Sequence, residues 1–249
     1  SETEEGMMAQ EAAGLGKPAN PRRQMIRAAV GLILYLLLAP ALMFLFAGTL
    51  AWPMAWVYFV LLLAAALVSR LIVLRRSPDL LRERARFTEA EGAEPGDRLL
   101  VGVVAIFGPA LTSIVVGIDH RAAWGPALPT MIQILAAVLV AAGFGLGAWA
   151  MIANRFFSAV VRIQRDRGHE VVTTGPYRWV RHPAYAGGIL AFLALPLMLD
   201  AVWALVPSLF IAVAIVLRTA LEDRMLVRAL PGYSEYAART RHRLLPGVW

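Results

Sequence analysis

The chain has 249 residues, of which 59% are hydrophobic and 16% are charged, and its formal net charge is +7. Soluble domains are roughly 45–50% apolar, so this composition excludes an ordinary soluble protein. The basic charge is better explained by cytoplasmic loops of a membrane protein than by nucleic acid. The absence of cysteine excludes disulfides and thiolate metal sites, and the four histidines are too scattered to indicate a metal site.

Long apolar runs predict an all-α polytopic bundle of about six membrane helices. Four runs are each long enough to cross a bilayer, and a fifth apolar stretch, broken at Asp200, has room for a hairpin of two short helices. The charged linker after the second run contains an amphipathic piece, residues 78–87, that suits a membrane surface. The expected spans are 26–50, 52–74, 99–118, 127–153 and a hairpin within 184–221.

Basic residues are divided unequally between the two sides of this predicted bundle. Arg121 lies in one short connection, and the other 23 of the 24 Lys and Arg lie on the opposite side. Because cytoplasmic loops are rich in Lys and Arg, we expect a bacterial inner-membrane protein with both termini in the cytoplasm. Its expected regions are a cytoplasmic tail (1–25), a four-helix membrane region (26–153) and a C-terminal region with a loop, a helical hairpin and a tail (154–249).

Polar, aromatic and small residues are concentrated in the segment 175–188. Pro183 disfavours helix at His182, so a helix should begin just after His182, with Tyr185 and Gly187 in its first turns. The N-terminus of such a helix presents N–H groups and a positive dipole end, which suit an anionic group of a ligand. The alternative is an ordinary interfacial belt of Tyr, Trp and Arg.

A second polar pair, Arg218 and Glu222, lies at the inner end of the last expected span. Residues four apart share one face of a helix, whereas Asp223 points elsewhere. Taken alone, this pair predicts an interfacial salt bridge, worth under about 1 kcal/mol if it is exposed.

The order of these motifs resembles the isoprenylcysteine carboxyl methyltransferase family of integral membrane methyltransferases and, more distantly, the phospholipid methyltransferases. The resemblance covers about the last hundred residues, and the preceding part of the chain matches only in being membrane helices. Two departures are Asp223 in place of a second Glu, and Pro231 before Gly232 in place of Phe. The residues that carry it run in order as His169-Glu170-Val171-Val172, Gly175-Pro176-Tyr177, Arg181-His182-Pro183-Ala184-Tyr185, Arg218, Glu222-Asp223, and Tyr233 with Tyr236.

The resemblance implies S-adenosylmethionine as the cofactor. The lack of cysteine and the scattered histidines predict no metal. A glutamine that helps to hold the cofactor in eukaryotic members is Arg162 here, unless Gln164 takes its place. Arg218 would lie toward the methyl acceptor. The resemblance assigns the cofactor pocket to His169, Glu170, Val171, Val172, Tyr177, His182, Pro183, Ala184, Tyr185 and Glu222.

The resulting hypothesis is methyl transfer to a lipophilic acceptor, with membrane lipids as surroundings and no nucleic-acid partner. A carboxylate acceptor is the first choice by resemblance. An amine of a phospholipid or a small thiol is the alternative within this class. Two other classes remain open: a reductase, similar to sterol reductases, that uses NADPH, and a non-catalytic membrane scaffold.

Overall fold

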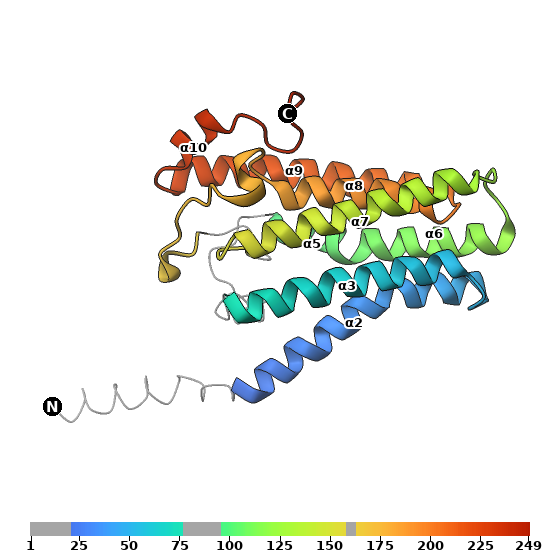
Figure 1. Cartoon of the computed structure of the whole chain (residues 1–249). Helices are drawn as coiled ribbons and strands as arrows, with labels where there is room; N and C mark the ends of the chain where they lie inside the picture. Colours follow the sequence, from blue (N-terminus) through green and yellow to red (C-terminus); the bar gives the residue numbers. More distant parts are fainter. Residues whose placement is uncertain (1–20, 77–95, 158–162) are drawn as a thin grey trace.

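The computed structural model describes residues 21–76, 96–157 and 163–249, and within these ranges the chain forms helices joined by turns and loops, without a strand. Figure 1 shows the long helices lying side by side, with the C-terminal residues at one end of the bundle. The long helices are α2 (Pro21–Ala47), α3 (Pro53–Arg76), α6 (Gly108–Ala122), α7 (Thr130–Ala153), α8 (Pro183–Met198) and α9 (Leu205–Ala229). The short ones are α5 (Asp97–Gly102), the π-helix η2 (Val103–Phe107), α10 (Tyr233–Arg239) and the 3-10 turns η3 (Arg165–Arg167), η4 (Gly175–Arg178) and η5 (Val202–Ala204).

Six helical segments account for the expected membrane spans. Five described segments are long and apolar enough to cross a bilayer, and α8 is a shorter apolar helix of 16 residues. α5, η2 and α6 follow one another directly and together make the third span, 99–122. The predicted all-α membrane bundle is therefore confirmed, and the protein is an integral membrane protein. Of the predicted polar tail 1–25, residues 1–20 lie outside the described residues and 21–25 form the beginning of α2. The predicted amphipathic piece 78–87 also lies outside the described residues.

Proline sets the beginning of two helices. α3 begins at Pro53 and α8 at Pro183, where the missing N–H of proline costs no helical hydrogen bond. His182 has φ −127° and ψ 61°, outside the helical region, because the ring of Pro183 disfavours helical geometry in the residue before it. The predicted start of the helix just after His182 is confirmed.

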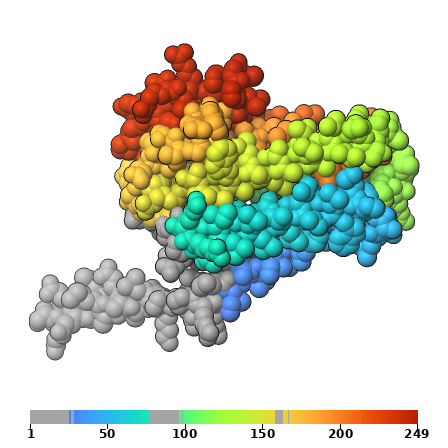
Figure 2. Space-filling model, in the orientation of Figure 1, coloured from blue at the N-terminus to red at the C-terminus, as the bar shows by residue number. Residues whose placement is uncertain are grey.

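The core and the polar clusters lie at opposite ends of the bundle. The largest buried cluster, which includes Met43, Trp52, Val116, Val140 and Met198, gathers where α2 joins α3 and α8 approaches α9. At the other end, which we call the tail end, α10 and the residues after it lie on α8 and α9, as the red atoms in Figure 2 show. The apolar packing at the first end anchors the helices, so their other ends are held at fixed positions around the tail.

Two glycines allow α7 and α8 to pack closely. A Cβ added to Gly143 of α7 would lie 2.5 Å from the carbonyl oxygen of Gly187 of α8 and 2.9 Å from the Cβ of Ala191, whereas a Cβ on Gly145 would meet open space. Forcing an extra carbon into a packed contact costs about 1–3 kcal/mol. We therefore expect Gly143→Ala to lower the melting temperature of the detergent-solubilised protein by several degrees and Gly145→Ala to leave it nearly unchanged. Equal losses in both variants would contradict this close contact.

Candidate functional site

A buried carboxylate organises the tail end of the bundle. Asp223 of α9 is 2% exposed, and its two oxygens pair with the guanidinium of Arg181 at 2.8 and 2.9 Å. Oδ2 also accepts from Nε of Arg243 at 2.7 Å, and Oδ1 accepts from the hydroxyl of Tyr233 at 2.9 Å. Nε2 of His182 lies 3.3 Å from Oδ1. We call these five residues the Asp223 cluster; it joins the loop before α8, helix α9 and the tail.

Arg181 fixes the tail beside the beginning of α8. Its Nη1 donates to the carbonyl oxygens of Thr240 at 2.9 Å and Arg241 at 3.0 Å, just after α10 ends. The backbone N–H groups of Arg181 and His182 donate to the carbonyl oxygens of His242 at 3.0 Å and Arg243 at 2.9 Å. Because helix C-terminal carbonyls favour cations, one guanidinium holds both Asp223 and the end of α10.

Three buried tyrosines complete this end of the molecule. The hydroxyl of Tyr236 donates to the carbonyl oxygen of Tyr177 at 2.6 Å, and the hydroxyl of Tyr177 accepts from Asn154 at 3.3 Å. Burial raises the pKa of Tyr236 to about 12 and raises the pKa of Tyr177 above its ordinary value. Burial, reinforced by the Asp223 carboxylate, likewise raises the pKa of Tyr233. All three phenols therefore stay protonated at neutral pH and can donate hydrogen bonds.

A second polar cluster lies beside the first, on another face of α9. The hydroxyl of Tyr185 donates to Oε2 of Glu222 at 2.6 Å, and the guanidinium of Arg218 lies 5.5 Å from the centre of the Tyr185 ring. Nε of Arg218 pairs with Oδ1 of Asp97 at 2.7 Å. The rings of His182 and Tyr185 are stacked with centroids 5.7 Å apart, so His182 touches both clusters. We call Tyr185, Glu222, Arg218 and Asp97 the Glu222 cluster.

The two clusters carry opposite formal charge. In the Asp223 cluster one carboxylate faces two guanidiniums, those of Arg181 and Arg243. Among the residues that the structure describes, the Glu222 cluster holds two carboxylates, those of Glu222 and Asp97, and the guanidinium of Arg218. An anionic group is thus favoured at the beginning of α8, where the helix dipole acts in the same direction, and a cationic group is favoured near Glu222.

The loop 163–175 is closed by its own side chains. Nε2 of Gln164, which is fully buried, donates to the carbonyl oxygen of Phe156 at 2.6 Å, and its Oε1 accepts from Arg167. Nδ1 of His169 accepts from the backbone N–H of Gln164 at 3.3 Å, and the His169 ring lies against Phe156. Gln164 is therefore engaged within the loop; its alternative for contacting the cofactor, Arg162, lies outside the described residues.

The structure brings together most of the residues assigned to the site. His182, Tyr185, Glu222 and Arg218 lie in the two clusters, with Pro183 buried and Ala184 half-buried in the first turn of α8. Tyr177 is connected to this end of the bundle through the hydrogen bond that its backbone carbonyl oxygen accepts from Tyr236. Val171 packs against the apolar cluster of α9 and α10, and Val172 is half-buried. His169 is half-buried in its own loop, and Glu170 is exposed.

Five cluster members were not assigned to the site from the sequence: Asp97, Arg181, Asp223, Tyr233 and Arg243. Asp97 follows a charged linker and gave no signal. The sequence gives Asp223 no role in the site, because this residue points away from Glu222. The structure confirms that direction, which leads to Arg181, Arg243 and Tyr233. The sequence signals for this set were the motif positions of Arg181, Asp223 and Tyr233, whereas Asp97 and Arg243 had none.

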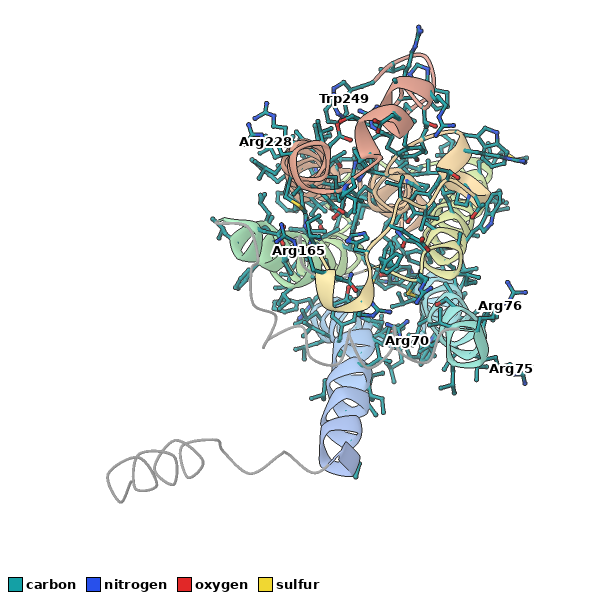
Figure 3. The ribbon with its side chains drawn as sticks, turned by 90° about the vertical axis from the view of Figure 1, so that its left-hand side faces the viewer. Arg70, Arg75, Arg76, Arg165, Arg228 and Trp249 are labelled. Atoms are coloured by element: carbon teal, nitrogen blue, oxygen red, sulfur yellow. The ribbon has the colours of Figure 1, made fainter. Side chains whose placement is uncertain are left out.

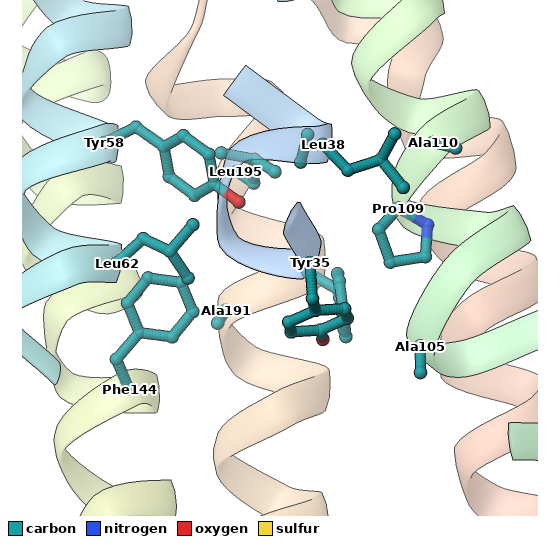
Figure 4. A pocket seen from close by; sticks show the side chains of 12 residues that line it. Tyr35, Leu38, Tyr58, Leu62, Ala105, Pro109, Ala110, Phe144, Ala191 and Leu195 are labelled. Carbon is teal, nitrogen blue, oxygen red and sulfur yellow. The ribbon is translucent and has the colours of Figure 1, made fainter. Parts of the chain in front are cut away.

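An apolar cavity lies between the helices, nearer the middle of the bundle. It has a volume of about 90 Å³ and is formed by α2, α3, η2, α6, α7 and α8. Its wall includes Tyr35, Tyr58, Phe144, Ala191 and Leu195, as Figure 4 shows. Ala191 lies six residues after Tyr185 on α8, which is about 9 Å along a helix. The cavity therefore lies further along the bundle than Tyr185, among the membrane-spanning helices.

Part of the chain is similar to a known family of membrane methyltransferases. Residues 131–231 match the family model of phospholipid methyltransferases. The predicted resemblance to this type of membrane methyltransferase is confirmed over these residues, which run from α7 through α9 and contain every member of the two clusters except Asp97, Tyr233 and Arg243. The match begins at residue 131, in α7, whereas the predicted C-terminal region begins at residue 154.

Three curated bacterial proteins are similar to parts of the chain. The cobalt-zinc-cadmium resistance protein CzcN of Cupriavidus metallidurans is 36% identical over 99 residues, 38% of this chain and 44% of its own length. The nickel-cobalt-cadmium resistance protein NccN of Alcaligenes xylosoxydans xylosoxydans is 32% identical over 108 residues, 43% of this chain and 49% of its own. The uncharacterized protein YpbQ of Bacillus subtilis is 43% identical over 60 residues, 24% of this chain and 36% of its own. The chain thus spans less than half the length of the curated relatives it matches.

Proposed function

We propose that this protein transfers a methyl group from S-adenosylmethionine to a lipophilic acceptor within the membrane. The cofactor would supply an electrophilic methyl group on a sulfonium centre, together with an amino-acid head. The carboxylate of that head would lie at the beginning of α8, near His182, and the amine near Glu222 and Tyr185. The pocket would further include Tyr177, Pro183, Ala184 and the segment from His169 to Val172.

The opposite charge of the two neighbouring clusters is the observation that carries this proposal. A zwitterionic head needs an anion site and a cation site a few ångströms apart, and the stacked rings of His182 and Tyr185 separate two such sites. A sulfonium is also attracted to aromatic faces, and the ring of Tyr185 already lies beside a cation, the guanidinium of Arg218. An uncharged lipid alone would not require this arrangement.

A carboxylate is the acceptor that Arg218 suits best. A guanidinium binds a carboxylate through two parallel hydrogen bonds, which would orient one carboxylate oxygen as the nucleophile. A carboxylate needs no base, so the protein would accelerate the reaction by positioning the acceptor and excluding water. The hydrocarbon part of the acceptor would reach the site through the membrane, from the side of the apolar cavity.

A phospholipid amine is the second candidate acceptor. The family-model match to phospholipid methyltransferases favours it, and the carboxylates Glu222 and Asp97 provide negative charge for an amine. An amine must lose a proton, so this reaction would show a pH dependence that methylation of a carboxylate lacks.

We further propose a bacterial inner membrane with both termini in the cytoplasm and a functional division at about residue 154. Figure 3 looks onto the tail end, where Arg75, Arg76 and Arg228 point away from the bundle, and all three are exposed. Positive charge collects on cytoplasmic surfaces, and the cofactor is available there. Reporter fusions after Trp249 should read cytoplasmic and fusions near Arg121 periplasmic; the reverse would separate the site from its cofactor.

Calorimetry on the detergent-solubilised protein tests the proposed activity. S-adenosylmethionine and S-adenosylhomocysteine should each bind with a dissociation constant on the order of micromolar and raise the melting temperature, because a ligand that binds only the folded state stabilises it. NADPH serves as the comparison ligand. Binding of NADPH without binding of S-adenosylmethionine or S-adenosylhomocysteine would favour the reductase alternative over the methyltransferase.

A further inference from the structure

Arg218 is held by a carboxylate that comes from the other half of the chain. Nε of Arg218 donates to Oδ1 of Asp97 at 2.7 Å and Nη2 donates to Oδ2 at 3.3 Å, so both carboxylate oxygens are engaged. The two residues are 121 positions apart, and Arg218 is 8% exposed and Asp97 1% exposed. A buried pair of this kind is specific, since removal of one partner leaves the other charge buried.

The position of Asp97 is the one that an acceptor carboxylate would need. The guanidinium of Arg218 lies against the ring of Tyr185, and Tyr185 in turn holds Glu222. A carboxylate on the two nitrogens of Arg218 therefore lies beside the proposed place of the methyl donor. In this structure the carboxylate there is Asp97.

The helix that carries Asp97 has an irregular connection to the rest of its span. Asp97 is the first residue of α5, which has six residues and passes directly into η2, a five-residue π-helix, before α6 begins. Gly96, just before it, has a φ of +86°, which favours glycine. π-helical turns are frequent at functional sites because they alter the helical register. The irregular turn η2 thus separates α5, which carries Asp97, from α6.

We propose that Asp97 occupies the acceptor's place on Arg218 and leaves it when a carboxylate acceptor binds. Asp97 is then a positioning residue: it keeps the guanidinium of Arg218 paired and oriented while the acceptor is absent. This inference rests on the carboxylate acceptor of the proposed function. It implies that Asp97 lowers the affinity for anionic ligands, whereas a purely structural residue would support binding.

Binding of a long-chain carboxylate tests the exchange without a methyl donor. Dodecanoate and its uncharged counterpart dodecan-1-ol would be added to the protein in a neutral detergent, and melting temperature and affinity measured. The wild type should bind dodecanoate more tightly than dodecanol. Asp97→Asn should lower the melting temperature in the absence of ligand, increase the affinity for dodecanoate roughly tenfold, and leave dodecanol binding unchanged. An unchanged or weaker affinity of Asp97→Asn for dodecanoate would overturn the proposal.

Asp119→Asn is the matched control. Asp119 is equally buried, lies at the opposite end of the same span and accepts a hydrogen bond from the backbone of Gly125; its replacement should not change dodecanoate affinity. If Asp97→Asn does not fold, Asp97→Glu replaces it, since a longer side chain disturbs the two-point pairing; its affinity for dodecanoate should also rise, and an unchanged value overturns the proposal. Failure of S-adenosylmethionine to bind would refute the proposed function but leave this result intact, so the two failures are distinguishable.

Discussion

Replacing Asp223 by alanine should release the C-terminal tail and strongly destabilise the protein. Asp223 pairs with Arg181 and Arg243 and accepts from Tyr233. Its removal would leave the guanidinium of Arg181, 8% exposed, without its carboxylate, and breaking a buried pair costs about 3–5 kcal/mol. We expect a fall of many degrees in melting temperature, and rapid tryptic cleavage after Arg239 or Arg241.

Arg224→Ala is the control for this prediction, because Arg224 is the next residue on α9 and is exposed. It should leave both the melting temperature and the pattern of proteolysis as in the wild type. Asp223→Asn should fall between the two, since an amide keeps the shape of the side chain but not its charge. Normal stability and a protected tail in Asp223→Ala would mean that the apolar contacts of Tyr233 and Tyr236 alone hold α10 in place.

Glu222→Ala should weaken binding of S-adenosylmethionine by one to two orders of magnitude, whereas Arg218→Ala should leave that affinity nearly unchanged and lower turnover. A hydrogen bond to a charged group is worth about 1.5–3 kcal/mol, and Glu222 is proposed to bind the amine of the cofactor. His182→Ala should also weaken binding of the cofactor, because His182 contacts residues of both clusters. Calorimetry gives the affinities, and a radiolabelled methyl-transfer assay gives the turnover.

Arg218→Ala removes the guanidinium that pairs with the buried carboxylate of Asp97. The double variant Arg218→Ala with Asp97→Asn removes both charges and serves as the control for misfolding. If the folded double variant lost cofactor binding while Glu222→Ala bound the cofactor normally, Arg218 rather than Glu222 would be the residue that binds the cofactor.

The sequence was sufficient to predict the helices and part of the site. Apolar runs of this length predict membrane-spanning helices. Pro183 defines the beginning of α8, because its ring restricts the backbone of His182. The spacing of Arg218 and Glu222 placed both on one side of α9, where the structure has them beside Tyr185. These features depend on residues close together in the chain, for which helical geometry is enough.

The remaining contacts depend on parts of the chain that lie far apart. Asp97 meets Arg218 across 121 positions, and Arg181 meets Asp223 across 42. No local pattern indicates such pairs, because they follow from how α5, α8, α9 and the tail pack. Asp223 was judged by its direction relative to Glu222, whereas its importance comes from what lies on its own side of the helix.

α8 has 16 residues, which is about 24 Å of helix, whereas the hydrocarbon core of a bilayer is about 30 Å thick. A helix this short cannot match the core, and the mismatch is relieved by thinning of the lipid around it. Because the C-terminal end of α8 is fixed by the buried core around Met198 and Leu199, the shortfall falls at the end that carries His182. We therefore expect a hollow in the leaflet at the tail end, where water descends several ångströms and a lipid headgroup can sink to the level of Arg218 without leaving the bilayer.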